Sequence, residues 1–178
     1  MKKHSLNFYI VISALFLCLL SSKPARCQGW PDHEIKTLPD SSFAVIETGK
    51  NGSIIRHCPF RDAKGNINEE QLIYVLGTFG KETWADPNNK EIARKYLEKY
   101  YNRFMKDIRK KGLQEPVNIN KAKLTELVPL PRIGPVLAVK IAQYRKKHGS
   151  FKTVEDIQKI AGIGYETFNG IRYYIRTR

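Results

Sequence analysis

The chain has 178 residues, and its 31 Lys and Arg outnumber its 17 Asp and Glu, so that the formal net charge is +14. An apolar content of 42% is ordinary for a globular protein, which excludes a chain too polar to form a core, and the length allows one or two small domains. The basic excess favours a polyanionic partner, a nucleic acid before an anionic membrane surface.

Residues 1–27 predict a secretory signal peptide. Lys2 and Lys3 precede an apolar run from Phe8 to Leu20, and a more polar segment follows. The run is shorter than the roughly 17–25 residues of a membrane span. We therefore expect cleavage before Gln28 or nearer Ser22, with an uncleaved anchor as the alternative. The mature protein is expected to be periplasmic or extracellular and to keep no integral membrane span.

The cleavage site decides how the cysteines are used. Cys18 leaves with the signal, whereas a retained Cys27 could form a disulfide with Cys58 in an oxidising compartment. His57 precedes Cys58, but two adjacent ligands fall short of the about four that a structural zinc site needs. We expect a buried thiol beside a surface imidazole, and neither a metal site nor a cofactor.

Residues 28–42 predict a flexible lead-in, and residues 43–112 a small ββαα unit whose role the sequence does not indicate. Apolar, β-favouring runs at 43–48 and 53–58 flank a Gly/Asn turn and predict a β-hairpin. Asn68 is expected to cap a first helix that ends near Gly77 and Gly80. Asp86 and Pro87 are expected to begin a second helix that stops at Gly112.

An apolar and aromatic stripe follows this second helix at spacings of four residues. We expect the stripe to face the core, with stacking on nucleic-acid bases as the alternative. Its members are Ile92, Tyr96, Tyr100, Phe104 and Ile108.

Residues 117–178 contain two repeats of one supersecondary unit, with a constant offset of 30 residues between equivalent positions. The equivalent pairs are Leu124 and Val154, Leu127 and Ile157, Leu130 and Ile160, Ile133 and Ile163, Gly134 and Gly164, Ile141 and Ile171, and Tyr144 and Tyr174. Each copy predicts two short helices around a turn with Pro or Gly. Asn120 is expected to cap the first helix of copy one, and Thr153, paired with Asp156, the first helix of copy two.

Each turn has the features of an anion site. A Gly at the turn permits positive φ and leaves its amide uncovered, and the following helix begins with unpaired N–H groups. Residues 117–178 also hold 12 basic and 4 acidic residues, whereas residues 28–116 hold 15 and 13. The anion sites and the basic excess therefore fall in the same third of the chain.

These turns, the segment Val117–Ala122 and the connector His148–Ile157 resemble the tandem helix-hairpin-helix domain of the competence protein ComEA family. The resemblance covers residues 117–178 and implies non-specific binding of double-stranded DNA outside the cytoplasmic membrane during DNA uptake. The family pattern Leu-Pro-Gly-Ile-Gly departs at Arg132, which replaces the first Gly. Either the first hairpin bends differently, or the Arg132 guanidinium takes over a phosphate contact.

The sequence thus predicts an α+β, mostly α protein: a ββαα unit, then an all-α tandem helix-hairpin-helix domain at 117–178. DNA phosphates would be held by backbone amides and by Lys, Arg and Thr side chains, without base readout. The candidate DNA-binding residues are Arg132, Ile133, Gly134, Lys140, Gly162, Ile163, Gly164, Tyr165, Thr167 and Arg172.

No catalytic constellation is found, so we expect no enzyme. A protein of the uptake machinery or the envelope is a further expected partner. The alternative function is a secreted scaffold that binds protein only, because the extrinsic PsbU protein of photosystem II also resembles a tandem helix-hairpin-helix domain.

Overall fold

The computed structural model describes residues 29–112 and 115–178, so the predicted signal peptide with Cys18 and Cys27 lies outside the described residues. The elements before residue 113 are α1 (Asp32–Thr37), η1 (Asp40–Ser42), β1 (Phe43–Thr48), β2 (Ile54–Pro59), α2 (Glu69–Thr78), η2 (Phe79–Lys81) and α3 (Pro87–Lys111). Those after it are β3 (Val117–Asn118), α4 (Leu124–Leu127), α5 (Pro135–His148), η3 (Val154–Lys159), α6 (Tyr165–Ile171), η4 (Arg172–Tyr174) and β4 (Ile175–Arg176). The prediction of an α+β, mostly α fold is confirmed.

The predicted β-hairpin is present. Strands β1 and β2 pair antiparallel, with Val45 opposite His57, and Gly52 takes a φ of 77° in the turn between them. The preceding residues, for which we expected a flexible lead-in, contain the short helices α1 and η1. The backbone N–H of Trp30 donates to Gln71 Oε1 at 3.0 Å, which joins this segment to α2.

Local capping signals fix the starts of α2 and α3 and the end of α3, as expected. Asn68 accepts from Gln71 N at 2.9 Å at the start of α2, and Asp86 accepts from Asn88 N at 2.8 Å at the start of α3. Helix α3 ends at Lys111, and its C-cap Gly112 has a φ of 67°. That left-handed conformation carries little strain for a glycine, which is why the helix stops there.

The predicted core stripe of α3 is confirmed only in part: Tyr100 and Phe104 pack against the apolar clusters, but the stripe does not follow the buried face of the helix. Ile92 is 57% exposed, whereas the buried positions of the helix are Ala93, Leu97 and Met105. At 3.6 residues per turn, a spacing of four residues advances about 40° beyond a full turn at each step. A stripe repeated four times therefore winds around the helix and cannot stay on one buried face.

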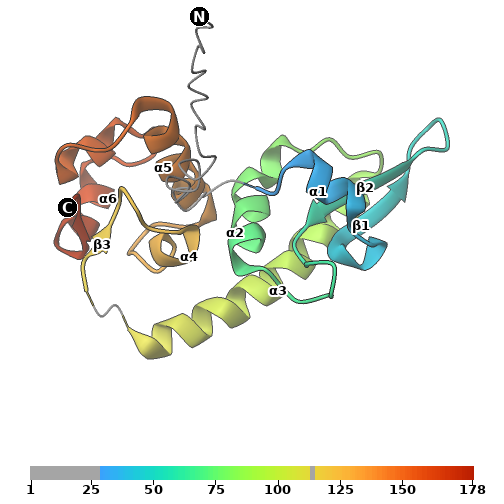
Figure 1. Ribbon diagram of the computed structural model, residues 1–178, viewed down its shortest axis with the longest axis horizontal. Coiled ribbons are helices and arrows are strands. Elements are labelled where there is room, and N and C mark those ends of the chain that lie inside the picture. Colours follow the sequence, from blue (N-terminus) through green and yellow to red (C-terminus); the bar gives the residue numbers. More distant parts are fainter. Residues whose placement is uncertain (1–28, 113–114) are drawn as a thin grey trace, which may run out of the picture.

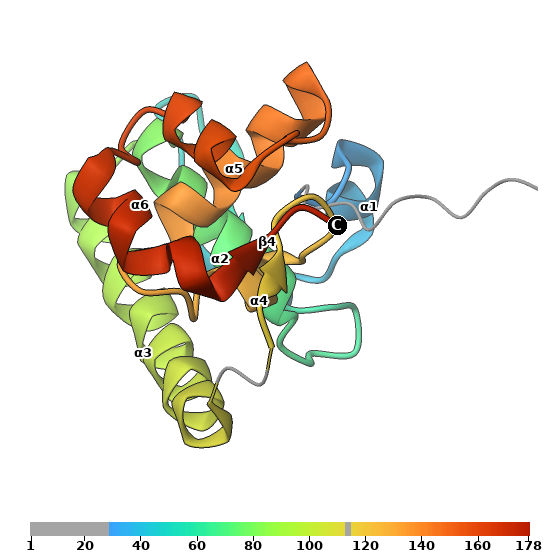
Figure 2. The same cartoon turned by 90° about the vertical axis from the view of Figure 1, so that its left-hand side faces the viewer.

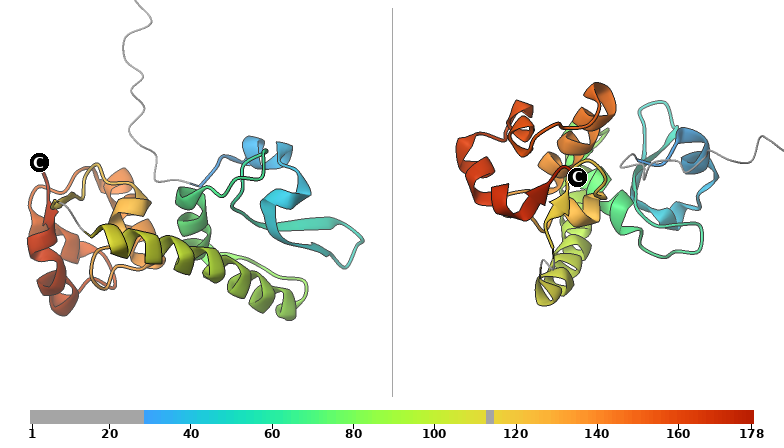
Figure 3. Two further views of the ribbon diagram at one scale, coloured as in Figure 1. Left: turned by 90° about the horizontal axis from the view of Figure 1, so that it is seen from below. Right: turned by 60° about the vertical axis from the view of Figure 1, so that its left-hand side comes forward.

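Helix α2 lies between two apolar clusters. Ile73 belongs to the cluster that includes α4, α5 and α6, whereas Leu72 and Val75 belong to the cluster under the β-hairpin. Helix α3 likewise gives Met105 to the first cluster and Leu97 to the second. The core thus crosses the boundary expected between residues 43–112 and 117–178, and α3 runs along both parts in Figures 1 and 3.

The C-terminal repeats are closed by contacts between distant segments. Strands β3 and β4 form a parallel pair that joins the two ends of this region, with Val117 opposite Ile175; Figure 2 shows β4 with α5 and α6 toward the viewer. Asn120 does not cap α4, contrary to expectation. Its amide Nδ2 donates to the carbonyls of Phe151 and Thr177 at 3.0 Å, and its Oδ1 accepts from Phe151 N at 2.8 Å.

The other predicted cap of this region is present. The Asp156 carboxylate accepts from the backbone N–H of Thr153 at 3.1 Å and of Lys152 at 2.8 Å. Within residues 29–112 and 115–178, no helix combines the length and the apolar character that crossing a bilayer requires.

Candidate nucleic-acid interface

The two hairpins of the repeat fold through the same hydrogen bond. Ile133 N donates to Leu130 O at 3.1 Å in hairpin 1 (residues 128–134), and Ile163 N donates to Ile160 O at 2.9 Å in hairpin 2 (residues 160–164). Both isoleucine side chains are buried, at 2% and 1% exposure. Ile133 and Ile163, two of the candidate residues, therefore anchor the hairpins, and their amides are already used within the turn.

Arg132 adopts the backbone conformation that the second repeat gives to a glycine. Its φ is 62°, and the φ of Gly162 at the equivalent position is 104°. The next glycines also agree, with φ and ψ of −88° and −178° at Gly134 and −86° and −174° at Gly164. Of the two possibilities left open at Arg132, a different bend of hairpin 1 is therefore not what the structure shows. The guanidinium is exposed and has no ion pair within the described chain.

Each hairpin presents backbone N–H groups where the next helix begins. Gly134 O and Gly164 O accept the first intrahelical bonds, from Ala138 N at 3.0 Å and Phe168 N at 2.9 Å. The amides just before those donors have no intrahelical partner. Among the described residues, none of these amides has another acceptor: Gly134, Val136 and Leu137 in hairpin 1, and Gly164, Tyr165, Glu166 and Thr167 in hairpin 2.

Hairpin 2 offers one more donor because Pro135, at the first position of α5, has no N–H. The space beside the first glycine of each set is empty. No atom lies within 4 Å of an added Cβ at Gly134 or at Gly164, and Tyr165 is 70% exposed. Open, unpaired amides next to exposed cationic residues can bind the oxygens of a phosphate.

Lys140 joins the two repeats. Its Nζ donates to Ala161 O in hairpin 2 at 2.7 Å, and a Cβ added to Gly162 would lie 3.7 Å from the same Nζ and 3.0 Å from Leu137 Cδ2. Lys140 is in the first repeat, but its ammonium lies beside the hairpin of the second. It has three donor hydrogens, so two remain for an anion bound there.

The Arg172 side chain contacts its neighbour Tyr173. Its guanidinium lies 4.5 Å from the centroid of the Tyr173 ring and donates to the Tyr173 hydroxyl. Thr167 is half-buried in the first turns of α6. The structure thus brings Lys140, Gly162 and Gly164 together, and it places Arg172 beside an exposed tyrosine.

A family model described as the helix-hairpin-helix motif matches residues 113–176. This segment is a helix-hairpin-helix region. It is 44% identical over 62 residues to ComE operon protein 1 of Bacillus subtilis (strain 168), which covers 35% of this chain and 30% of that protein. The predicted likeness to the ComEA family is confirmed for the C-terminal third.

The chain also matches endonuclease/exonuclease/phosphatase family domain-containing protein 1 of several vertebrates. Identity to the human protein is 37% over 62 residues, 35% of this chain and 11% of that protein. Identity to the Danio rerio protein is 39% over 147 residues, 81% of this chain and 25% of that protein. The chain spans less than a third of the length of each of these relatives.

Glu70 and Gly77 of α2 support the helix-hairpin-helix region, and the sequence analysis missed both roles. The Glu70 carboxylate accepts from Leu124 N at 3.1 Å, Thr125 N at 3.0 Å and Thr125 Oγ1 at 2.7 Å, and so caps α4. A Cβ at Gly77 would lie 2.7 Å from Pro135 O. Helix α2 therefore packs directly behind hairpin 1. The local sequence of neither segment indicates this contact, because the two partners are more than 50 residues apart.

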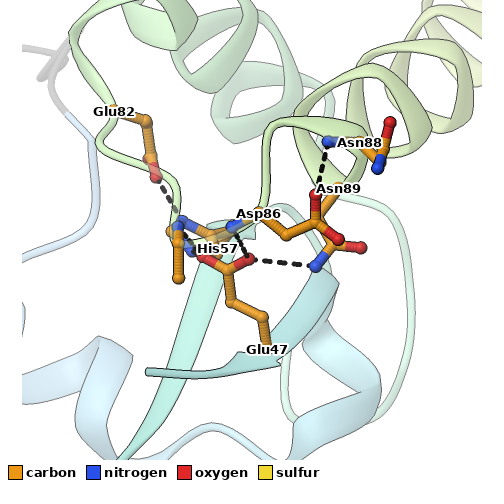
Figure 4. A network of polar contacts seen from close by, with 7 residues as sticks. Glu47, His57, Glu82, Asp86, Asn88 and Asn89 are labelled. Atoms are coloured by element: carbon orange, nitrogen blue, oxygen red, sulfur yellow. Dashed lines mark hydrogen bonds and ion pairs between the residues drawn. The ribbon is translucent and has the colours of Figure 1, made fainter. Parts of the chain in front are cut away.

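A second polar cluster, drawn in Figure 4, is buried under the β-hairpin. His57 lies between two carboxylates, with Nε2 2.8 Å from Glu47 Oε1 and Nδ1 2.8 Å from Glu82 Oε2, and its ring stacks on Trp84 at 4.0 Å. Glu47 also accepts from Asn89 Nδ2 and from the amides of residues 85 and 86. These hydrogen bonds, chiefly the one from Asn89, lower the pKa of Glu47 to about 2.

This cluster ties β1 and β2 to the start of α3. His57 is 3% exposed, so the expectation of a surface imidazole was wrong, and that of a buried Cys58 thiol is confirmed. Burial, with a smaller contribution from Glu82, raises the pKa of the Cys58 thiol and keeps it protonated. No group of three or more His, Cys, Asp and Glu in the described part of the chain is arranged to hold a metal ion.

Proposed function

We propose that this chain is an exported, non-enzymatic protein that binds double-stranded DNA through backbone phosphates without sequence preference. One observation carries the proposal: two hairpins with the same backbone geometry expose unpaired amides in a helix-hairpin-helix region of strong basic excess. The likeness to ComE operon protein 1 supports a role in DNA uptake, with an uptake or envelope protein as a further partner. Export, to the periplasm or the cell exterior, rests on residues 1–27, which predict a signal peptide.

In this mechanism the amides of residues 134, 136 and 137 hold one phosphate and those of residues 164–167 a second. Lys140 adds charge at hairpin 2, where it is already anchored to Ala161 O. Arg132 adds an exposed guanidinium at hairpin 1. Because these groups contact phosphates and not base edges, they carry affinity but no sequence information.

The matches to endonuclease/exonuclease/phosphatase family domain-containing protein 1 do not change this proposal. They cover 11% of the human protein and 25% of the Danio rerio protein. A helix-hairpin-helix region supplies a phosphate-binding surface, and the chemistry of an enzyme depends on its own site.

The first test measures binding of two unrelated labelled duplexes by fluorescence anisotropy across a salt series, with protein that starts at Gln28. We expect equal affinities and a log–log salt slope of about −2 from the two hairpin phosphates, steeper where further cations of the chain contact the duplex. A clear preference for one duplex would contradict a backbone-only mechanism. No binding at low salt would contradict the proposal and favour a protein partner.

The amide mechanism is tested with Gly164→Leu. Gly164 has an ordinary φ of −86° and open space around it, so a side chain fits without strain but covers the amides of hairpin 2. We expect DNA affinity to fall at least tenfold with the fold intact. Gly170→Leu is the matched control, because Gly170 is equally open but lies within α6, past the hairpin. Equal binding by both variants would refute the amide contact.

A further inference from the structure

The second half of α3 is a separate centre of positive charge. From Lys99 to Lys111 the helix contains six basic residues and one acidic residue, Asp107. The remainder of residues 28–116 contains nine basic and twelve acidic residues, so the net charge of the whole segment is small even though this part of α3 is strongly basic. The α3 basic face is defined here as Lys99, Arg103, Lys106, Arg109 and Lys110.

The two halves of α3 differ in how their charges are paired. In the first half, Arg94 lies 3.2 Å from Glu98 and Lys95 lies 3.6 Å from Glu91. All five members of the α3 basic face are exposed, and within the described residues none has a carboxylate within 4 Å. Lys99, Arg103, Lys106 and Lys110 follow one another at three- and four-residue spacings, and Arg109 lies three residues after Lys106. Like charges at these spacings repel and destabilise a helix. A polyanion would relieve that repulsion.

This half of α3 lies against the helix-hairpin-helix region. Met105 is 8% exposed and belongs to the same apolar cluster as Ile133 and Ile163 of the two hairpins, and Phe104 packs against that cluster. Figure 1 and the left view of Figure 3 show the end of α3 beside the C-terminal repeats and away from the β-hairpin.

Next to Met105 the helix borders an open hollow of about 580 Å³; the described residues that line it all belong to α3 and include Lys106, Arg109 and Lys110 of the α3 basic face. A hollow lined by three cations and open to solvent can accept the phosphates of a rigid backbone. The most exposed apolar residues of α3, Ile92 and Tyr96, lie in the other half of the helix, and every fully exposed residue from Lys99 to Lys111 is polar or charged. Such a surface suits a nucleic acid better than the apolar edge that a lipid surface requires.

We propose that the α3 basic face is a second DNA-binding surface, which holds phosphates of the same duplex next to the stretch held by the hairpins. This inference rests on the proposed function. At a rise of 1.5 Å per residue the face extends about 16 Å, which matches about five base pairs of duplex. The unit at residues 43–112, whose role the sequence left open, thereby contributes to the same binding event as the helix-hairpin-helix region.

The test compares two triple variants of the whole mature chain. The face variant combines Lys106→Gln, Arg109→Gln and Lys110→Gln. The control variant combines Lys90→Gln, Arg94→Gln and Lys95→Gln, which removes the same charge from the other half of the same helix. Salt-series anisotropy on a duplex of about 30 base pairs measures affinity, and hydroxyl-radical footprinting measures the protected length.

We expect the face variant to lose at least tenfold in affinity at low salt, to reduce the salt slope by about two to three, and to shorten the footprint by about five base pairs. The control variant should stay within about twofold of the unchanged protein, since its charges are far from the hairpins or paired with carboxylates. Circular dichroism checks that both variants keep their helical content.

Each other result overturns the inference in a distinguishable way. If the face variant binds like the unchanged protein while Gly164→Leu does not bind, the α3 surface is wrong and the proposed function stands. If both triple variants weaken equally with an unchanged footprint, the effect is one of net charge alone. If no form binds DNA but the α3 basic face is needed to bind phosphatidylserine vesicles, the polyanion is a membrane, and the proposed function fails with the inference.

Discussion

Replacing Glu70 by alanine removes the carboxylate that joins α2 to the first helix of the repeats. Glu70 accepts three hydrogen bonds, from Leu124 N, Thr125 N and Thr125 Oγ1, at 3.1, 3.0 and 2.7 Å. Loss of a helix cap costs about 1 kcal/mol, and a hydrogen bond to a charged group contributes about 1.5–3 kcal/mol. Because water can reach part of this site, we expect the free energy of unfolding to fall by about 2 kcal/mol.

For a chain of this size, that loss corresponds to a Tm lower by about 4–8 °C. Urea and thermal unfolding followed by circular dichroism measure it, and tryptophan fluorescence, which comes from Trp30 and Trp84, follows the part before residue 113 separately. Glu69→Ala is the matched control: Glu69 is exposed, lies in the same helical turn and has no hydrogen bond or ion pair among the described residues. Glu70→Gln, which keeps an acceptor and loses the charge, should fall about halfway between the two.

The reasoning would be refuted if Glu70→Ala and Glu69→Ala had the same stability. Coincident transitions by dichroism and by tryptophan fluorescence are expected as well, because α2 and α3 contribute to both apolar clusters. Two separate transitions would show that residues 43–112 and 117–178 unfold as independent domains.

Three further predictions concern single residues. Arg132→Gly should raise the free energy of unfolding in urea by up to about 1 kcal/mol, because a glycine adopts the left-handed backbone conformation with less strain. The same variant should reduce the DNA salt slope by about one, because the guanidinium no longer contacts a phosphate. Lys140→Met should also lower that slope by about one, and an unchanged slope would place its ammonium outside the interface. The pKa of Glu47 is lowered to about 2, so the stability it adds is complete above about pH 4.5 and is lost as the pH falls toward 2. Glu47→Gln should therefore unfold with a weaker dependence on pH between 5 and 2 than the unchanged chain, and Asp156, whose pKa is also lowered to about 2, accounts for part of the remaining dependence.

The site was predictable wherever a few neighbouring residues determine the backbone. The constant offset between Gly134 and Gly164 located both hairpins, and Asp86 followed by Pro87 located the start of α3. A cap or a tight turn is satisfied by groups two to four residues away, so its signal is complete within a short window of sequence. The exception at Arg132 could not be resolved that way, because the repeat contains Gly in one copy and Arg in the other and only the structure gives the φ of each.

The sequence by itself determined the repeat, the basic excess of the C-terminal third, and the presence of the β-hairpin and of the two helices that follow it. Only the tertiary structure decided what these parts face. Glu70 caps a helix more than 50 residues away, His57 is buried between Glu47 and Glu82, and α3 turns Met105 rather than Ile108 into the core. Such contacts depend on partners that are distant along the chain and close in space. Local propensity therefore does not specify them. They form only when α2 and α3 pack against both apolar clusters, the one under the β-hairpin and the one of the C-terminal repeats.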